Sequence, residues 1–104
     1  MRGIVINPYI RSITEVVVDA DDIRSLQLAL SWAGAPCTEI GVAGSFPNGD
    51  NLLITPVFKE EPTFSLGLHQ HIGGMAIILG VQDGEWADAK FLLTDLQDRI
   101  MFHK

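Results

Sequence analysis

The chain has 104 residues with 13 acidic and 7 basic side chains, and its net charge is −6. This acidic balance argues against direct binding to nucleic acid, which needs a basic face, and no apolar run approaches the roughly 20 residues that a membrane span requires. The hydrophobic fraction of 47% is typical of globular proteins, so we expect a single domain over residues 1–104.

Two β-strands are predicted at the start of the chain. Residues 3–7 form a short apolar run that Pro8 ends, and residues 13–19 are rich in β-branched side chains. The few residues between these runs favour a turn. We therefore expect the two strands to pair as a hairpin.

A helix is predicted at about residues 20–33. The acidic run at 19–22 can accept hydrogen bonds from the free N–H groups of a first helical turn. Gly34 and Pro36 supply the signals that end a helix. Apolar residues at helical spacing indicate the buried face, namely Ile23, Leu26 and Leu30.

Further strand patterns occur at residues 38–43, 51–58, 63–68, 75–81 and 85–89. Residues 75–81 are almost wholly apolar, which is typical of a central strand that is buried on both faces. Asp83 and Gly84 predict a tight turn. Residues 69–74 combine two histidines with two glycines, and we expect them to be a flexible connection.

The end of the chain predicts a short second helix. Thr94 and Gln97 match the capping-box spacing, so the helix is expected to start at Thr94. Residues 101–104 should either fray or add a short edge pairing. The whole pattern predicts an α+β fold, with a mainly antiparallel sheet of five to seven short strands, one packed helix and a short C-terminal helix.

The chain carries no recognisable catalytic constellation. Neighbouring carboxylates such as Asp21 and Asp22 fall in turns and helix starts, not on opposite sides of a cleft. No serine lies in a Gly-x-Ser-x-Gly elbow. Cys37 is the single cysteine, so an intramolecular disulfide is impossible, and no basic cluster beside it in sequence would activate it. We expect a protein that is not an enzyme, has no cofactor and resides in the cytoplasm.

His69 and His71 are candidate metal ligands. Residues i and i+2 of a strand point the same way, so a His-x-His pair can hold one metal ion. A site needs a third ligand, and His103 is far along the chain. The alternative is a pair of surface histidines in a loop bounded by glycine.

Acidic and aromatic residues are candidates for a protein interface. If the acidic turns share a face, that face would suit a basic partner; otherwise they form a solvated surface. Trp86 follows a tight turn and could be a core residue or an interface anchor, and Phe46 could be an anchor or a lid over the core. The candidate interface residues are Asp19, Asp21, Asp22, Phe46, Asp83, Glu85, Trp86 and Asp88.

Both ends of the chain carry motifs that resemble a known family. These motifs are residues 3–8 and 13–16 with the acidic helix start, then residues 76–80, 84–85, 93–96 and 99–102. In these motifs the chain resembles a family of short uncharacterised proteins from phages and mobile elements, whereas residues 35–70 do not match. The resemblance implies a phage or mobile-element setting, in which many small acidic proteins bind and inhibit host machinery, and it transfers no catalytic residues.

The preferred hypothesis is a non-enzymatic binding protein that engages or inhibits a host protein through an acidic surface. A defence complex or a nucleic-acid-handling complex is a candidate partner. One alternative is a small-ligand or metal-binding domain centred on His69 and His71. Another is a module that pairs with a copy of itself as a homodimer.

Overall fold

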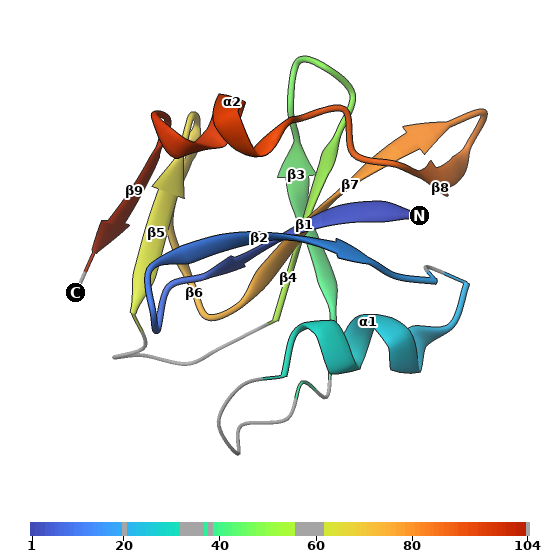
Figure 1. Ribbon diagram of the computed structural model, residues 1–104, viewed down its shortest axis with the longest axis horizontal. Helices are drawn as coiled ribbons and strands as arrows, with labels where there is room; N and C mark the ends of the chain where they lie inside the picture. The colour runs from blue at the N-terminus through green and yellow to red at the C-terminus, as the bar shows by residue number, and fades with distance from the viewer. Residues whose placement is uncertain (20, 32–36, 38, 56–61, 104) are drawn as a thin grey trace.

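The computed structural model describes residues 1–19, 21–31, 37, 39–55 and 62–103. Two antiparallel sheets and two short helices make up this part of the chain (Figure 1). Helix α1 lies against one face of the larger sheet, and the smaller sheet and α2 lie toward its other side. The predicted α+β class is confirmed.

The larger sheet has the strand order β2-β1-β7-β4-β3, and β8 pairs with β7 outside this path. All of its ladders are antiparallel, and the predicted hairpin of the first two strands is confirmed. The strands are β1 (Arg2–Asn7), β2 (Ser12–Val17), β3 (Gly41–Ser45), β4 (Asn51–Ile54), β7 (Ala76–Gln82) and β8 (Glu85–Ala87).

The smaller sheet has the order β6-β5-β9, with β5 (Thr63–Leu66), β6 (His69–Gly73) and β9 (Ile100–His103). The expectation of a flexible connection at residues 69–74 is therefore wrong. Gly67 has a φ of 60° and, with Leu68, forms a two-residue turn that brings the next segment back onto β5. Strand β9 takes the edge pairing that was one of two alternatives, and together β6 and β9 bring the described residues to nine strands instead of five to seven.

Strand β7 separates two hydrophobic cores, and four consecutive residues of it are fully buried. Successive side chains of a strand point to opposite faces, so these residues alternate between the cores. One core contains Ala76 and Ile78 and faces the smaller sheet; the other contains Ile77 and Leu79 and faces α1. The predicted central strand buried on both faces is confirmed.

Helix α1 (Ile23–Ala29) is shorter than the predicted helix at residues 20–33. The Asp22 side chain caps it by accepting the backbone N–H of Arg24 at 3.0 Å, so the acidic run forms the turn before the helix. Leu26 and Leu30 are buried, but Ile23 is 55% exposed and does not belong to the core face. The predicted stop signals at residues 34 and 36 lie outside the described residues.

Helix α2 (Leu93–Gln97) begins one residue before the predicted start. Leu92, not Thr94, is the capping residue, and the Asp95 carboxylate accepts its N–H at 3.0 Å. Leu96 of this helix is fully buried in the core.

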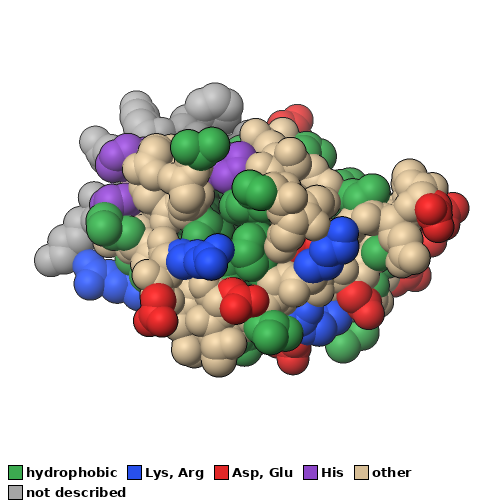
Figure 2. Space-filling model, turned by 90° about the horizontal axis from the view of Figure 1, so that it is seen from above, with side chains coloured by type: hydrophobic (Ala, Val, Ile, Leu, Met, Phe, Trp, Pro, Cys, Tyr) green, Lys and Arg blue, Asp and Glu red, His purple; other side chains and the backbone are tan. Residues whose placement is uncertain are grey.

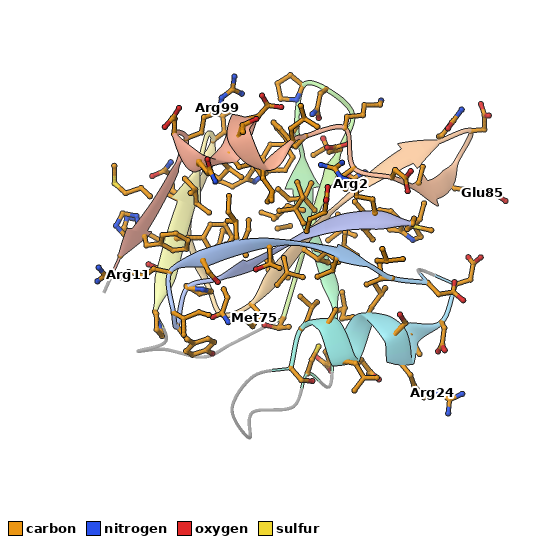
Figure 3. The ribbon with its side chains drawn as sticks, viewed as in Figure 1. Arg2, Arg11, Arg24, Met75, Glu85 and Arg99 are labelled. Carbon is orange, nitrogen blue, oxygen red and sulfur yellow. The ribbon has the colours of Figure 1, made fainter. Side chains whose placement is uncertain are left out.

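The segment between β8 and α2 is held by two charged side chains and by one backbone hydrogen bond, from the Ala89 N–H to the Arg2 carbonyl oxygen of β1. The Arg2 guanidinium donates to the carbonyl oxygens of Ala89 and Phe91 at 2.5 and 2.6 Å and also pairs with Glu15 (Figure 3). The carboxylate of Asp50, which is fully buried, accepts the N–H groups of Lys90 and Phe91. The buried backbone groups of this segment are thereby satisfied, and Phe91 is fixed in the core.

Candidate functional site

A surface groove of about 310 Å³ lies where the start of α1 meets the β7–β8 hairpin. Figure 1 shows this hairpin extending from the side of the larger sheet, with the start of α1 below it on the same side. Asp83 and Gly84 form the hairpin turn with φ values of 54° and 79°, which confirms the predicted tight turn. The turn brings Glu85 beside the end of β7.

The groove brings together residues from two acidic segments of the chain. It is lined by Asp21, Val81, Gly84, Glu85 and Trp86. Asp21 precedes α1 and Glu85 opens β8, so acidic residues more than sixty positions apart in sequence line one surface feature. This convergence is the arrangement that local sequence patterns could not establish.

The acidic side chains differ in how far the fold already uses them. Asp22 caps α1, and the Asp19 carboxylate accepts the N–H of Asp21 at 3.0 Å. The Asp88 carboxylate accepts the backbone N–H of Arg2 at 2.6 Å. These three carboxylates therefore stabilise local structure.

The carboxylates of Asp21, Asp83 and Glu85 have no hydrogen-bond or ion-pair partner within the described part of the chain. All three residues are exposed, and Figure 3 shows Glu85 at the outer end of the hairpin, directed away from the protein. Charges that the fold does not use are available to a partner.

Trp86 combines the two roles considered for it. Its side chain is half-buried and packs against the core beneath α1, while it also lines the groove. An aromatic ring that is held by the core on one side and open on the other loses little freedom when a partner covers it. Trp86 is thus a rigid part of the groove that Asp21 and Glu85 also line.

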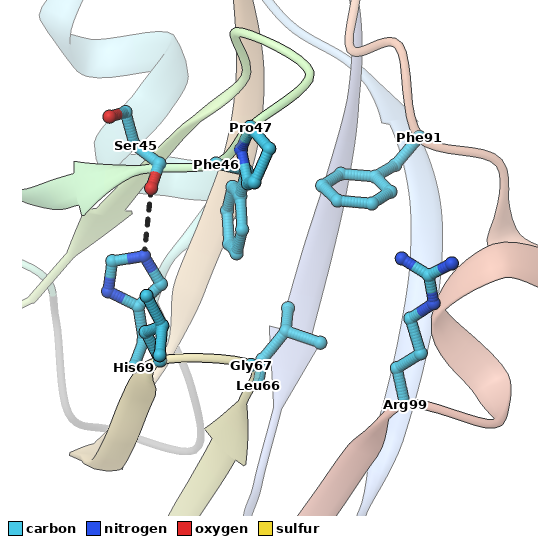
Figure 4. Close-up of a pocket in the computed structure, with 9 residues that line it drawn as sticks. Ser45, Phe46, Pro47, Leu66, Gly67, His69, Phe91 and Arg99 are labelled. Atoms are coloured by element: carbon cyan, nitrogen blue, oxygen red, sulfur yellow. Dashed lines mark hydrogen bonds between the residues drawn. The ribbon is translucent and has the colours of Figure 1, made fainter.

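Phe46 lies outside this groove. It is 9% exposed and belongs to the core that faces the smaller sheet. Its ring forms part of the wall of a second, apolar pocket that also includes His69, Phe91 and Arg99 (Figure 4). Sequence reasoning did not single out Phe91 or Arg99, because the pocket joins segments that share no local pattern.

The two histidines proposed as a metal pair have different neighbours. His69 Nε2 donates to the carbonyl oxygen of Ser45 at 3.1 Å and contacts Phe46 edge-on. His71 has a φ of 52° and stacks on His103 with ring centroids 4.6 Å apart. Within the described ranges, no three His, Cys, Asp or Glu side chains form a group that could hold a metal ion.

His103 also makes a short hydrogen bond with a serine. Its Nε2 lies 2.8 Å from Ser65 Oγ, and this hydroxyl accepts the N–H of His71 as well. Ser65 is only 5% exposed. A hydroxyl that is buried and doubly bonded supports the small sheet, and substrate has no open approach to it.

Cys37 is buried and donates its S–H to the carbonyl oxygen of Glu39 at 3.2 Å. Burial raises the pKa of this thiol above its ordinary value, because the thiolate would lose its hydration. The reactive thiolate form is therefore disfavoured at neutral pH.

No helix in the part of the chain that the structure describes is long and apolar enough to cross a membrane. A comparison with models of known families, with curated proteins and with solved structures finds no match to this chain. Function is therefore inferred from the charges, grooves and exposed side chains of the protein itself.

Proposed function

We propose that this protein is a non-enzymatic binding protein that engages a host protein through the acidic groove formed by Asp21, Val81, Gly84, Glu85 and Trp86. The observation that carries the proposal is the position of two unused carboxylates beside a half-buried tryptophan. In the phage or mobile-element setting that the sequence motifs imply, binding would block or redirect the host protein in the cytoplasm.

The chemistry of the groove favours a basic segment of the partner. Lysine and arginine side chains are attracted by the two carboxylates, and either can lie over the face of an indole ring. A net charge of −6 adds long-range attraction for a basic surface and repels nucleic acid. A host protein that itself binds nucleic acid, including one that acts in defence, presents a basic surface of this kind.

The decisive test compares two double variants that remove the same amount of charge. Asp21→Asn with Glu85→Gln neutralises the groove, whereas Glu39→Gln with Asp98→Asn neutralises two exposed carboxylates outside it. Wild-type protein and both variants are immobilised, exposed to bacterial lysate at low and high salt, and the retained proteins are quantified by mass spectrometry.

We expect one host protein to be retained in near-stoichiometric amount by the wild type and by the control variant. The groove variant should bind it about thirtyfold more weakly, since it removes two interfacial charge pairs that each contribute of the order of 1 kcal/mol. High salt should weaken the wild-type interaction as well. Equal retention by all three proteins would refute the groove as the interface.

The groove variant is expected to stay folded, which makes the comparison clean. Neither carboxylate has a partner within the described residues, so the free energy of unfolding should change by less than about 0.5 kcal/mol. Light scattering on the same samples tests self-association. A dimer that the groove variant disrupts would show that the partner is a second copy of this chain.

A further inference from the structure

A second pocket, of about 450 Å³, lies where three segments of the chain meet. Residues 45–47 run from the last residue of β3 into the next loop, residues 66–69 span the turn from β5 to β6, and Phe91 and Arg99 flank α2. Figure 4 shows these side chains surrounding one space, and Figure 2 shows hydrophobic side chains at a hollow on the face that carries α2. The volume is within the range of small-molecule sites.

The walls of this pocket are apolar and held in place by the core. The Phe46 ring contacts the His69 and Phe91 rings edge-on, with centroid distances of 4.9 and 5.1 Å. Phe46, Phe91 and Leu66 are each less than 10% exposed. Because His69 is also bound to the Ser45 carbonyl oxygen, a ligand would enter a cavity that is already formed.

The pocket has one permanently charged side chain, and that charge is positive. Arg99 lines the pocket, and Figure 4 shows its guanidinium directed toward the Phe91 ring. Its guanidinium has no hydrogen-bond or ion-pair partner in the described ranges, and it forms no ion pair with Asp98 beside it. No Asp or Glu residue lines the pocket.

An unpaired arginine at the edge of an apolar cavity selects a particular class of molecule. The apolar walls favour a hydrocarbon or aromatic body, and the guanidinium favours a carboxylate, which it can bind through two parallel N–H groups. The protein as a whole is acidic and repels anions, so Arg99 is the pocket side chain whose permanent charge would give a preference for a carboxylate.

The geometry points to a binding site for a small amphipathic carboxylate, with its apolar body between Phe46, Leu66 and Phe91 and its carboxylate at Arg99. Leu68, at the tip of the β5–β6 turn, is 96% exposed and lines the same pocket. A bound hydrocarbon would cover this leucine and remove its apolar surface from water. The site is separate from the acidic groove and does not depend on the function proposed for that groove.

The test uses two probes of equal length that differ in charge, decanoate and decan-1-ol. Each is titrated into ¹⁵N-labelled protein at constant ionic strength while amide chemical shifts are followed by NMR. The proteins are wild type, Arg99→Gln and Arg24→Gln. Arg24 is an exposed arginine on α1, away from the pocket, and serves as the matched control.

We expect both probes to shift the amide signals of Gly67, Leu68, Phe91 and Arg99. Decanoate should bind the wild type about tenfold more tightly than decanol, as one charge-assisted contact would produce. Arg99→Gln should reduce this preference to less than about twofold. Arg24→Gln, and the groove variant Asp21→Asn with Glu85→Gln, should keep it.

Three results would overturn the inference. The first is that neither probe shifts these four amide signals. The second is that decanoate and decanol bind the wild type equally. The third is that Arg24→Gln lowers the affinity for decanoate as much as Arg99→Gln does. The comparison of decanoate with decanol uses only the wild-type protein, so it tests the inference even if a substitution perturbs the fold.

Discussion

The carboxylate of Asp50 accepts the backbone N–H of Phe91 at 2.9 Å, although the two residues are 41 positions apart. Asp50 is fully buried and accepts the N–H of Lys90 as well. The Asp50 side chain thereby supplies hydrogen-bond acceptors that a neighbouring strand supplies elsewhere in the sheet. It also holds Phe91 where its ring forms a wall of the apolar pocket.

Replacing Asp50 with alanine should destabilise the protein strongly. Asp50→Ala leaves the N–H groups of Lys90 and Phe91 without their acceptor, and we expect the free energy of unfolding to fall by about 2–4 kcal/mol. Urea denaturation followed by circular dichroism measures the change. Asp50→Asn retains one acceptor oxygen and should lose less. A stability equal to that of the wild type in Asp50→Ala would show that the segment is held by other contacts.

Gly44 is expected to be required for the position of His69. A Cβ atom at residue 44 would lie 2.5 Å from Cε1 of the His69 ring, so Gly44→Ala must displace this ring from the Ser45 carbonyl oxygen. We expect a loss of about 1–2 kcal/mol in the free energy of unfolding and a changed His69 side-chain signal in NMR spectra.

The control for this substitution is Gly41→Ala, in the same strand. A Cβ atom at residue 41 would have no other atom within 4 Å, so its effect should stay within about 0.5 kcal/mol. Equal effects of the two alanines would mean that strand propensity, and not contact with His69, determines the result.

Local patterns were sufficient for the parts of the fold that local forces decide. The first hairpin, the central strand at residues 76–82 and the Asp83–Gly84 turn all follow from side-chain type and spacing. The acidic run before α1 caps the helix as predicted, through Asp22. Each of these features involves residues that are close in sequence.

Strand β6 was missed because its own residues carry a weak signal. Its polar side chains and its glycine lower strand propensity, and it forms because the Gly67 turn returns it to β5. Its pairing depends on the neighbouring strand, which in turn pairs with β9 almost forty positions later. Contacts between residues so far apart in sequence produce no periodic pattern of side chains that a sequence analysis could detect.

The candidate site was predictable in its residue types but not in its assembly. Asp21, Glu85 and Trp86 were all singled out from the sequence, whereas their meeting at one groove depends on how α1 packs against the larger sheet. Phe46 was grouped with them and belongs elsewhere. The pocket that it helps to form could not be foreseen, because Arg99 reaches it only through the register of α2.

Gly80 should tolerate no side chain. A Cβ atom there would overlap the backbone carbonyl oxygen of Asp88, and backbone cannot move aside as a flexible side chain can. We expect Gly80→Ala to lower the free energy of unfolding by more than about 2 kcal/mol and to separate β8 from β7. Hydrogen exchange of the β8 amides measures the second effect. An unchanged melting temperature would contradict the close approach of these two segments.

Cys37 should make the stability depend on pH in the alkaline range. Burial raises the pKa of its thiol in the folded protein, whereas the unfolded chain has a thiol pKa of about 8.5. Below the unfolded pKa the thiol is protonated in both states, and the stabilising contribution of Cys37 is complete. Above the unfolded pKa the unfolded state loses the thiol proton first, so this contribution is lost as the pH rises toward the higher pKa of the folded state.

Comparison with Cys37→Ala isolates this contribution, because all other titrating groups are common to both proteins. The wild type should lose stability relative to the variant between pH 7.5 and 9.5, by at most about 1.4 kcal/mol for each pH unit above the unfolded pKa. Iodoacetamide should also react with native protein more slowly than with denatured protein at pH 8, since less thiolate is present. A stability difference that stays constant with pH, together with equal alkylation rates, would show that the Cys37 thiol ionises as freely in the fold as in water.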